Sequence, residues 1–499
     1  MVRKIFSLLS RETSGLHSAA LLLAGSAFAS QILGLVRDRL FAHTFGASSE
    51  LDLYFAAFKI PDLIYIGSAL FVSLVVVIPA LTEALERSRA EARRFFDSLF
   101  VASLSVLIVV CAAAYVAMPA LAAALFPGFT ARSLAHDLVP LSRLMLLSPI
   151  FLSVSNLFAA LTHARRAFAL YALSPLLYNL GIIAGVLFFY PAFGLIGLGV
   201  GVVLGAALHA LIQLPFLIRE KFVPRFTLAP ALSGVFRTAL LSLPRSIALF
   251  SQHLAMLVLI SLATRLGEGA VATFSLGFNL QSVPLAIVGV AYATAAFPTF
   301  TRLVAQGKRE EFCERVTTAV RHIFFWSLPL GVLFFVLRAH IVQLVLGSGE
   351  FGGDATRLVA ALLAAFVLSL VAQSVSALLL RALYAAGETA KPLAAQLAAA
   401  LATVASAVLL LGVFSHGIDS GALFEKVFHV AGVRGSGALA LALAYSIGSI
   451  AGALALWLLF ERTVVGLWRD VRGSVFEIAL ASTLLGGTAL VILRILAGS

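Results

Sequence analysis

Apolar residues dominate this chain in long runs, and short polar stretches between the runs carry most of its charges. Each run has about 20 residues or more, the length that a helix needs to cross roughly 30 Å of hydrocarbon. We therefore predict thirteen membrane-spanning helices, over residues 18–41, 51–83, 95–120, 133–160, 167–190, 193–218, 235–264, 270–301, 313–345, 355–384, 392–415, 437–460 and 473–496. Several of these are too long to be straight, and Pro61, Pro284 and Pro329 are natural kink points.

Composition supports a multi-pass membrane protein. Of the 499 residues, 61% are apolar and only 12% are charged. The polar stretches 1–17, 219–233 and 416–436 are too short to bury cores of their own. The net charge of +12 would suit a nucleic acid, but the basic residues are spread over short loops without interleaved aromatics, so we expect no nucleic-acid partner. Cys111 and Cys313 lie in or beside apolar helices and indicate packing, with neither a disulfide framework nor a metal site.

Charge placement predicts the orientation of the chain. Arg3, Lys4 and Arg11 precede an apolar run, as in a signal peptide, but no small-residue cleavage site follows. We expect a retained first helix. Alternate loops on the same side as this basic N-terminus hold most of the Lys and Arg, so the positive-inside rule places the N-terminus in the cytoplasm and Ser499 outside.

An internal repeat is visible at a nearly constant offset. Pro79 and Pro298 lie 219 residues apart beside similar charged turns, and Arg165 and Pro175 have counterparts at Arg381 and Pro392. Because each repeat has an even number of helices, six, both copies enter the membrane from the same side. The predicted fold is an all-α polytopic membrane protein: two parallel six-helix repeats, residues 1–225 and 226–465, surround a central cavity, and 466–499 forms one additional C-terminal helix.

The stretch 37–62 holds the charges that most need an explanation. A charge inside a spanning segment is expensive and usually faces a cavity or a partner. We predict that Arg37, Asp38, Asp52 and Lys59 line a polar cavity; Asp52 and Lys59, seven residues apart, share one helix face. The alternative is that all four lie at the outer water interface, where long cationic side chains reach solvent.

Polar residues of the second half are more ambiguous. Arg245 lies about ten residues inside the predicted seventh helix, near mid-membrane, unless that helix begins later and leaves Arg245 at the cytoplasmic surface. Gln252 and His253 follow two turns later, and His253 suits a hydrogen-bonded packing role as well as proton transfer. Asn279 suits either contact between helices or cavity lining.

No motif for catalysis appears. The sequence has no paired carboxylates, metal-ligand cluster, nucleophile elbow or phosphate-binding glycine loop. The run GLIGLGVGVVLG at 194–205 indicates a small-residue helix face for close packing. We therefore expect a protein that is not an enzyme and that needs no cofactor or metal.

Several motifs occur in the order of one known family. They are GLVRDRLFAHTFGAS at 34–48, LDLYFAAFKIPDL at 51–63, LFPGF at 125–129, PRSIALFSQ at 244–252, NLQSVPLAIVGVAYATAAFP at 279–298, GSGEF at 347–351 and RALYAAGETAKP at 381–392. Together they resemble the MurJ (MviN) family of the multidrug, oligosaccharidyl-lipid and polysaccharide exporter superfamily.

The resemblance implies a flippase in the bacterial cytoplasmic membrane. Its substrate would be lipid II, the undecaprenyl-pyrophosphate-linked peptidoglycan precursor, moved to the outer leaflet by alternating access; membrane lipids and other cell-wall synthesis proteins would be its partners. By the same resemblance Arg37, Asp38, Asp52 and Lys59 take cavity roles. Cationic side chains there would compensate the pyrophosphate through charge-assisted hydrogen bonds.

This chain also departs from the family pattern. Gln31, Tyr65 and Asn279 stand where many members have Arg, so the usual phosphate clamp is incomplete, and we expect Arg245 to substitute in part. Val258 stands where some members place a sodium-binding carboxylate, so sodium coupling is unsupported. The family typically has fourteen helices.

Two other functions stay open. The first is a flippase or exporter of the same superfamily for another lipid-linked oligosaccharide or a drug, although a cation exporter should prefer acidic cavity residues. The second is a non-transporting scaffold that has lost its phosphate clamp.

Overall fold

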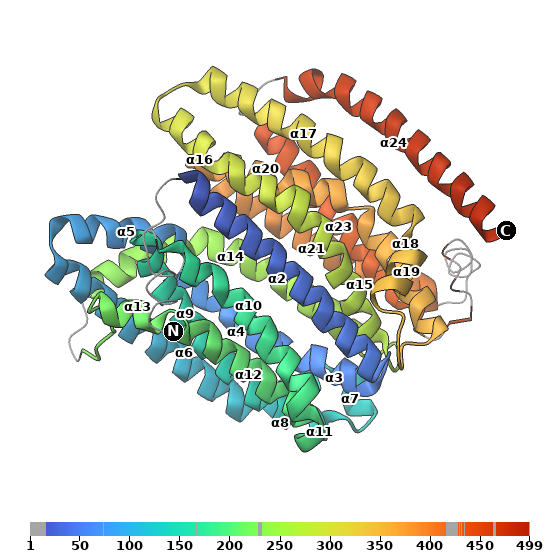
Figure 1. Ribbon diagram of the computed structural model, residues 1–499, viewed down its shortest axis with the longest axis horizontal. Helices are drawn as coiled ribbons and strands as arrows, with labels where there is room; N and C mark the ends of the chain where they lie inside the picture. The colour runs from blue at the N-terminus through green and yellow to red at the C-terminus, as the bar shows by residue number, and fades with distance from the viewer. Residues whose placement is uncertain are drawn as a thin grey trace. The chain divides into compact units, whose positions relative to one another are not determined.

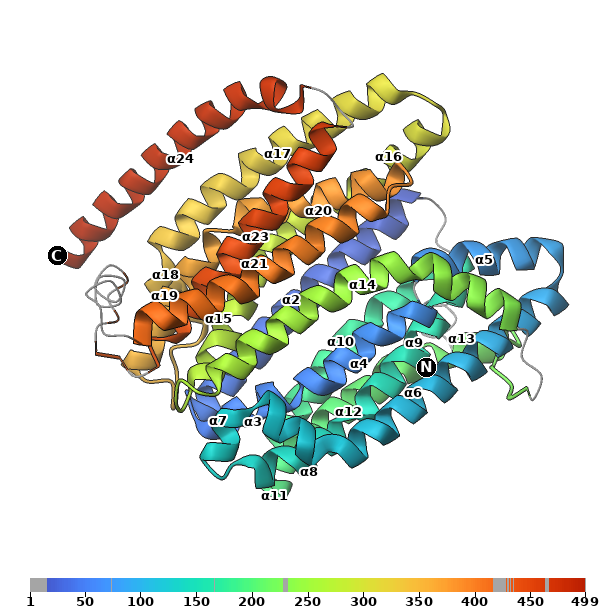
Figure 2. The same cartoon turned by 180° about the vertical axis from the view of Figure 1, so that it is seen from behind.

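The computed structural model describes residues 16–498, except 73, 166, 228–231, 416–427, 429, 431, 434 and 463–465. Throughout this part of the chain the regular structure is helical (Figures 1 and 2). The chain forms two compact units. Residues up to Phe41 and Leu53–Phe250 make the first, and Ala42–Asp52 with Ser251–Ser499 make the second.

The first unit holds the chain up to the middle of α14. Its helices are α2 (Leu16–Phe45), α3 (Ser49–Ala57), α4 (Lys59–Val72), α5 (Leu74–Arg87), α6 (Arg89–Leu125), α7 (Pro127–Ala131), α8 (Ala135–Met145), α9 (Leu147–Ala164), α10 (Phe168–Ala184), η1 (Gly185–Phe189), α11 (Tyr190–Phe193), α12 (Leu195–Leu211), α13 (Leu214–Arg219) and α14 (Leu232–Ala263). The last turn of α2 and the first of α3 belong to the second unit.

The second unit begins within α14. Its further helices are α15 (Ala270–Pro284), η2 (Leu285–Val290), α16 (Ala291–Ala305), α17 (Arg309–Val336), α18 (Arg338–Val345), α19 (Gly353–Val367), α20 (Leu370–Ala385), α21 (Ala390–Ser415), α23 (Ala438–Glu461) and α24 (Leu467–Gly498). In both ribbon views α24 runs along α17. Most of the α24 side chains face away from the protein: Trp468, Phe476 and Leu484 are each more than half exposed.

Each of the thirteen predicted segments coincides with one helix or with consecutive helices. Ten helices of the described residues are long and apolar enough to cross a membrane, or eleven if α19 and α20, bent by 44° at their junction, form one span. The all-helical, multi-pass fold is confirmed. A total of thirteen spans is compatible with this result and stays a prediction.

Two of the three expected kink points lie at or beside an irregularity of the helix. The second predicted segment is broken between α3 and α4, where Phe58 separates the helices. Pro61 follows and has no N–H to donate to the preceding turn. Likewise α15 ends at Pro284 and continues as the π-helix η2, whereas Pro329 lies inside an uninterrupted α17. The break places Lys59 at the first position of a new helix.

Glycines bring α10 and α12 into close contact within the first unit. A Cβ atom on Gly201 would lie 2.4 Å from the Cα of Gly185, and one on Gly181 would lie 2.3 Å from the Cα of Gly205. Only glycine allows backbones to approach this closely. The predicted small-residue face at 194–205 is thus confirmed, and it fixes α10, which carries one wall of the candidate site.

Residues 42–52 are a segment of the second unit inserted into the sequence of the first. The Glu350 N–H donates to the carbonyl of His43 at 3.0 Å, and the Ser49 hydroxyl donates to Glu268 Oε1 at 3.0 Å. Gly46 has a φ of +58°, and a Cβ there would lie 2.4 Å from the Glu350 carbonyl oxygen. The boundaries of the two compact units lie at 41/42, 52/53 and 250/251. The division into repeats at 225/226 stays a prediction.

Candidate functional site

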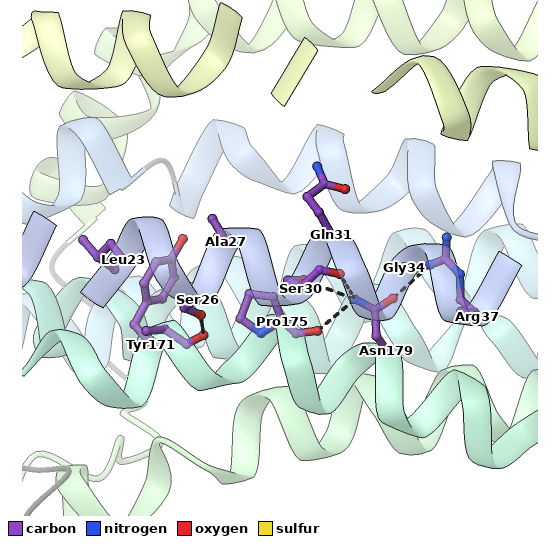
Figure 3. A pocket seen from close by; sticks show the side chains of 11 residues that line it. Leu23, Ser26, Ala27, Ser30, Gln31, Gly34, Arg37, Tyr171, Pro175 and Asn179 are labelled. Atoms are coloured by element: carbon purple, nitrogen blue, oxygen red, sulfur yellow. Dashed lines mark hydrogen bonds between the residues drawn. The ribbon is translucent and has the colours of Figure 1, made fainter. Parts of the chain in front are cut away.

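A pocket of about 390 Å³ lies between α2 and α10 in the first unit (Figure 3). Its lining comprises Leu23, Ser26, Ala27, Ser30, Gln31, Gly34 and Arg37 of α2 with Tyr171, Ala172, Pro175 and Asn179 of α10. On each helix the lining positions recur every three or four residues, so each helix presents one stripe to the pocket. The pocket is therefore a groove along two helices.

Small polar side chains bring these two helices together. The Ser26 hydroxyl donates to the carbonyl of Ala172, the residue next to Tyr171 on the pocket wall. One turn further on, the Asn179 side-chain amide donates to the Ser30 hydroxyl at 3.2 Å and to the Pro175 carbonyl at 3.2 Å. The Asn179 side chain reaches the Pro175 carbonyl because the two residues lie four positions apart on the same helix. Asn179 thereby fixes its own orientation and cross-links α10 to α2.

Arg37 lies at the end of the pocket and is held from two sides. Its Nε and Nη2 donate to Asp38 Oδ1 at 3.0 and 2.8 Å, and its Nη1 donates to Asn179 Oδ1 at 3.1 Å. The Asp38 side chain is only 4% exposed, whereas that of Arg37 is 22% exposed. The sequence predicted Arg37 and Asp38 for the site; the structure pairs them and adds Asn179.

The Arg37 guanidinium still has donors to offer. A guanidinium carries five N–H groups, and the hydrogen bonds to Asp38 and Asn179 use three of them. The pair with Asp38 also reduces the cost of placing this cation in a membrane-spanning helix. Arg37 is therefore a positioned, partly accessible cation, and among the described residues two of its N–H groups have no hydrogen-bond partner and can serve an anionic ligand.

Further polar groups of the first unit cluster around Arg37. Tyr54 and Tyr178 lie near Arg37, and Asp62 and Tyr65 lie near Tyr178. The Tyr54 ring packs on Phe41, with ring centroids 4.6 Å apart, which holds α3 against the end of α2. The α2, α3, α4 and α10 helices thus share one polar region. Tyr65 also lies in this region and accepts a hydrogen bond from Asn156 at 2.9 Å.

Lys59 belongs to the same region through a coulombic interaction with Asp62. Its side chain is half-buried at the first position of α4. Within the residues that the structure describes, its ammonium group makes no hydrogen bond and no ion pair. A half-buried lysine without such a partner is uncommon in a spanning segment, and it suits the predicted role of a ligand for an anion.

Asp52 has a different environment. Its side chain is fully buried, and its two oxygens accept hydrogen bonds at 2.8 Å from the backbone N–H groups of Gly269 and Ala272, at the start of α15. These donors have no partner within their own helix. An acidic side chain at a helix N-terminus also interacts favourably with the positive end of the helix dipole. Asp52 caps α15 in the second unit, where both of its oxygens accept hydrogen bonds. Its predicted place in a cavity stays a prediction.

The remaining predicted residues lie on other elements. Arg245 is half-buried on the part of α14 that belongs to the first unit. Gln252 and His253 lie beyond the unit boundary, and the Gln252 side chain donates to the Gln396 carbonyl at 2.6 Å. Asn279 is half-buried on α15. The structure groups Gln31, Arg37, Asp38, Lys59 and Tyr65 in one unit; the predicted cavity between the two lobes stays a prediction.

Asn179, Ser30 and Tyr178 are site residues that sequence reasoning did not identify. The available signal was a single Asn in an otherwise apolar helix, but nothing in the sequence pairs it with an arginine 142 positions away. Among the described residues, no group of three or more metal-binding side chains occurs. A groove of hydroxyls and amides ending in a positioned arginine can bind an anion that carries a polar extension.

By its all-helical, multi-pass fold the chain falls in a class of helical membrane proteins that includes solved transporters. A structure described as the inward-facing conformation of a multidrug resistance MATE family transporter of the MOP superfamily superposes with a TM-score of 0.68, at 17% identity over 90% of this chain and 99% of the other. Within this class the chain belongs to the family described as lipid II flippase MurJ, whose model matches residues 41–498.

Relatives of known name agree with this family. The lipid II flippase MurJ of Burkholderia cenocepacia is 26% identical over 438 residues, which cover 85% of this chain and 84% of that protein. The probable lipid II flippase MurJ of Thermotoga maritima is 27% identical over 81% of both chains. A structure of lipid II flippase MurJ in an inward closed conformation superposes with a TM-score of 0.72, at 21% identity over 95% of this chain and 97% of the other.

Proposed function

We propose that this protein is a flippase that moves lipid II from the inner to the outer leaflet of the bacterial cytoplasmic membrane. Membership of the MurJ family supports the substrate, and the family is one of transporters, so we assign no catalytic residues. The observation that carries the proposal in the structure is Arg37, which Asp38 and Asn179 hold at the end of a polar groove with two N–H groups left over.

The chemistry of the groove fits a pyrophosphate joined to a glycan. Arg37 supplies a cation at the end of the groove, and Lys59, which does not line the groove, supplies another from the start of α4. A pyrophosphate cannot enter a membrane protein without such compensation of its charge. Hydroxyl and amide groups along α2, among them Ser30 and Gln31, suit the hydroxyls and amides of a glycan. Gln31, Tyr65 and Asn279 stand where many family members have arginine. Arg37 and Lys59 must therefore compensate a larger share of the phosphate charge than they would in a complete clamp.

Translocation by alternating access follows from the fold. Proteins that share it have been solved in inward closed, inward-facing and outward-facing conformations. In such a cycle the headgroup passes through the protein while the lipid tail stays in the bilayer. The N-terminus would be cytoplasmic, by the distribution of Lys and Arg, and partners among other cell-wall synthesis proteins remain part of the proposal.

Complementation tests this function. The full chain is expressed in a bacterium depleted of its own lipid II flippase, and growth is compared among wild type and the variants R37Q, K59Q and R39Q. Arg39 is the matched control because it carries the same charge in the same helical turn but does not line the groove. We expect growth with wild type and R39Q, and loss of growth with R37Q and with K59Q at equal membrane expression.

Two outcomes would contradict the proposal. Failure of the wild-type chain despite good membrane expression would favour another lipid-linked substrate or a non-transporting scaffold. Full growth with both R37Q and K59Q would show that the groove does not hold the phosphate.

A further inference from the structure

The second unit contains a larger cavity, of about 590 Å³, between α16 and α17. This volume lies within the range of about 300–1,000 Å³ that is usual for small-molecule sites. Its polar lining consists chiefly of Tyr292, Thr299, Arg302, Arg315, Thr318 and His322. None of these residues takes part in the groove around Arg37, which lies in the other unit.

The cavity has an apolar floor and polar walls. The lining positions recur every three or four residues on both helices, so each helix contributes one face. Phe300, Leu303 and Ala319 form the floor and also belong to the buried core of the second unit. Because this floor is part of the packed core, the cavity is a fixed feature of the fold.

Two arginines make the cavity cationic. In the part of the chain that the structure describes, neither Arg302 nor Arg315 makes a hydrogen bond or an ion pair. Glu311 is the acidic residue of the lining, and Lys308 compensates its charge through an ion pair of 2.8 Å. The charge left over is therefore positive, and it comes from guanidinium groups, whose fork of donors matches the oxygens of a phosphate.

With the turn between α16 and α17 at the bilayer surface, the two arginines fall within the headgroup layer. The α16 helix ends at Ala305, three residues after Arg302, and α17 begins at Arg309, six residues before Arg315. At 1.5 Å per residue these distances are about 5 and 9 Å. A hydrocarbon core of about 30 Å within a bilayer of about 40–45 Å leaves a headgroup layer of about 5–8 Å on each side.

At the end of the cavity farther from the turn between α16 and α17, polar side chains are already hydrogen-bonded within the protein. Tyr292 and His322 lie about 13 residues from the same helix ends, or about 20 Å. The Tyr292 hydroxyl and His322 Nδ1 are hydrogen-bonded to each other. Likewise Thr294, near this wall, accepts a hydrogen bond from Arg381 at 3.0 Å. The capacity to bind a ligand is thus concentrated at the end of the cavity nearer this turn, at Arg302 and Arg315.

We propose that this cavity binds the phosphate group of an anionic membrane lipid between Arg302 and Arg315, with Thr299 and Thr318 as nearby hydroxyl groups and the lipid chains along the apolar floor. The site is separate from the groove that we assign to lipid II. A net negative headgroup such as phosphatidylglycerol is preferred over zwitterionic phosphatidylcholine, because the phosphate of the latter is already compensated by its own ammonium group.

The test uses the full chain, purified in detergent and titrated with lipids while bound lipid is counted by native mass spectrometry. Phosphatidylglycerol and phosphatidylcholine are compared for wild type, R302Q/R315Q, R302K/R315K and R309Q. Arg309 is the control because it lies in the same loop region but does not line the cavity. We expect the double glutamine variant to bind phosphatidylglycerol about tenfold more weakly, the double lysine variant to lose less, and R309Q to match wild type.

Equal affinity of wild type and R302Q/R315Q for phosphatidylglycerol would overturn the proposal. A second arm adds inorganic phosphate and diphosphate as competitors. If either displaces phosphatidylglycerol at concentrations similar to that of the lipid, the site is one for a soluble phosphate and the assignment to a lipid is wrong. Thermal unfolding of each variant excludes loss of binding through loss of folding, and the lysine variant provides a folded, charge-matched reference.

Discussion

Substitutions of Asn179 can show whether the groove binds an anion or only packs two helices together. Its side-chain oxygen accepts from Arg37 Nη1 at 3.1 Å, and its amide bonds Ser30 and Pro175. N179A removes all of these contacts. N179D keeps an acceptor for Arg37, and strengthens that bond, but adds a negative charge beside the proposed phosphate.

The structure gives the size of both effects. Loss of one hydrogen bond to a charged group costs about 1.5–2 kcal/mol, so we expect N179A to transport roughly tenfold more slowly. In N179D the new carboxylate would lie about 6 Å from a phosphate oxygen bound on the far side of Arg37, and at an effective dielectric constant of about 20 their repulsion is about 3 kcal/mol. That corresponds to a loss on the order of a hundredfold.

The assay is transport of a fluorescent lipid II analogue in proteoliposomes, with the thermal-unfolding midpoint measured on the same preparations. The order expected for transport is wild type, then N179A, then N179D, whereas N179D should unfold at a higher temperature than N179A. Transport by N179D equal to or above that of N179A would refute the reasoning, because it would mean that Arg37 needs only to be held in place and meets no anion.

Three further predictions concern stability and the role of Arg245. D52A leaves two buried N–H groups at the start of α15 without acceptors, and we expect it to destabilise the protein by about 2–5 kcal/mol, measured by thermal unfolding, whereas the exposed D354A should have no effect. G201V forces a side chain into the contact between α10 and α12 and should destabilise the protein by about 3 kcal/mol. Its control is G412V, because a Cβ on Gly412 would have nothing within 4 Å. Equal thermal-unfolding midpoints for the two variants would contradict the packing argument. R245A should slow lipid II transport severalfold if Arg245 replaces part of the missing clamp, and undiminished transport would exclude that role.

The helices were largely predictable because a bilayer imposes one dominant requirement, an apolar run long enough to span it. Breaks within helices were predictable only where a proline removes an N–H, as at Pro61 and Pro284. Pro329 shows the limit of that rule. It lies inside α17, which continues without interruption on both sides.

The candidate site was only partly predictable, because local sequence shows that a polar residue exists but not which residue meets it. Arg37 and Asp38 are neighbours in the chain, and their pairing could be inferred. Asp52 and Asn179 could not be assigned in the same way. Asp52 meets the start of α15, more than 200 residues later, and became a helix cap; Asn179 meets Arg37 across two helices and became part of the site.

The insertion of residues 42–52 into the second unit means that this unit is not encoded by a continuous stretch of the gene. A C-terminal fragment beginning at Ser251 would lack the carboxylate that binds the N–H groups of Gly269 and Ala272. Supplied as a separate piece, an N-terminal fragment would expose that carboxylate instead. Expression of the second half by itself therefore calls for a fusion that restores residues 42–52, and simple truncation at the unit boundary is the wrong way to divide this protein.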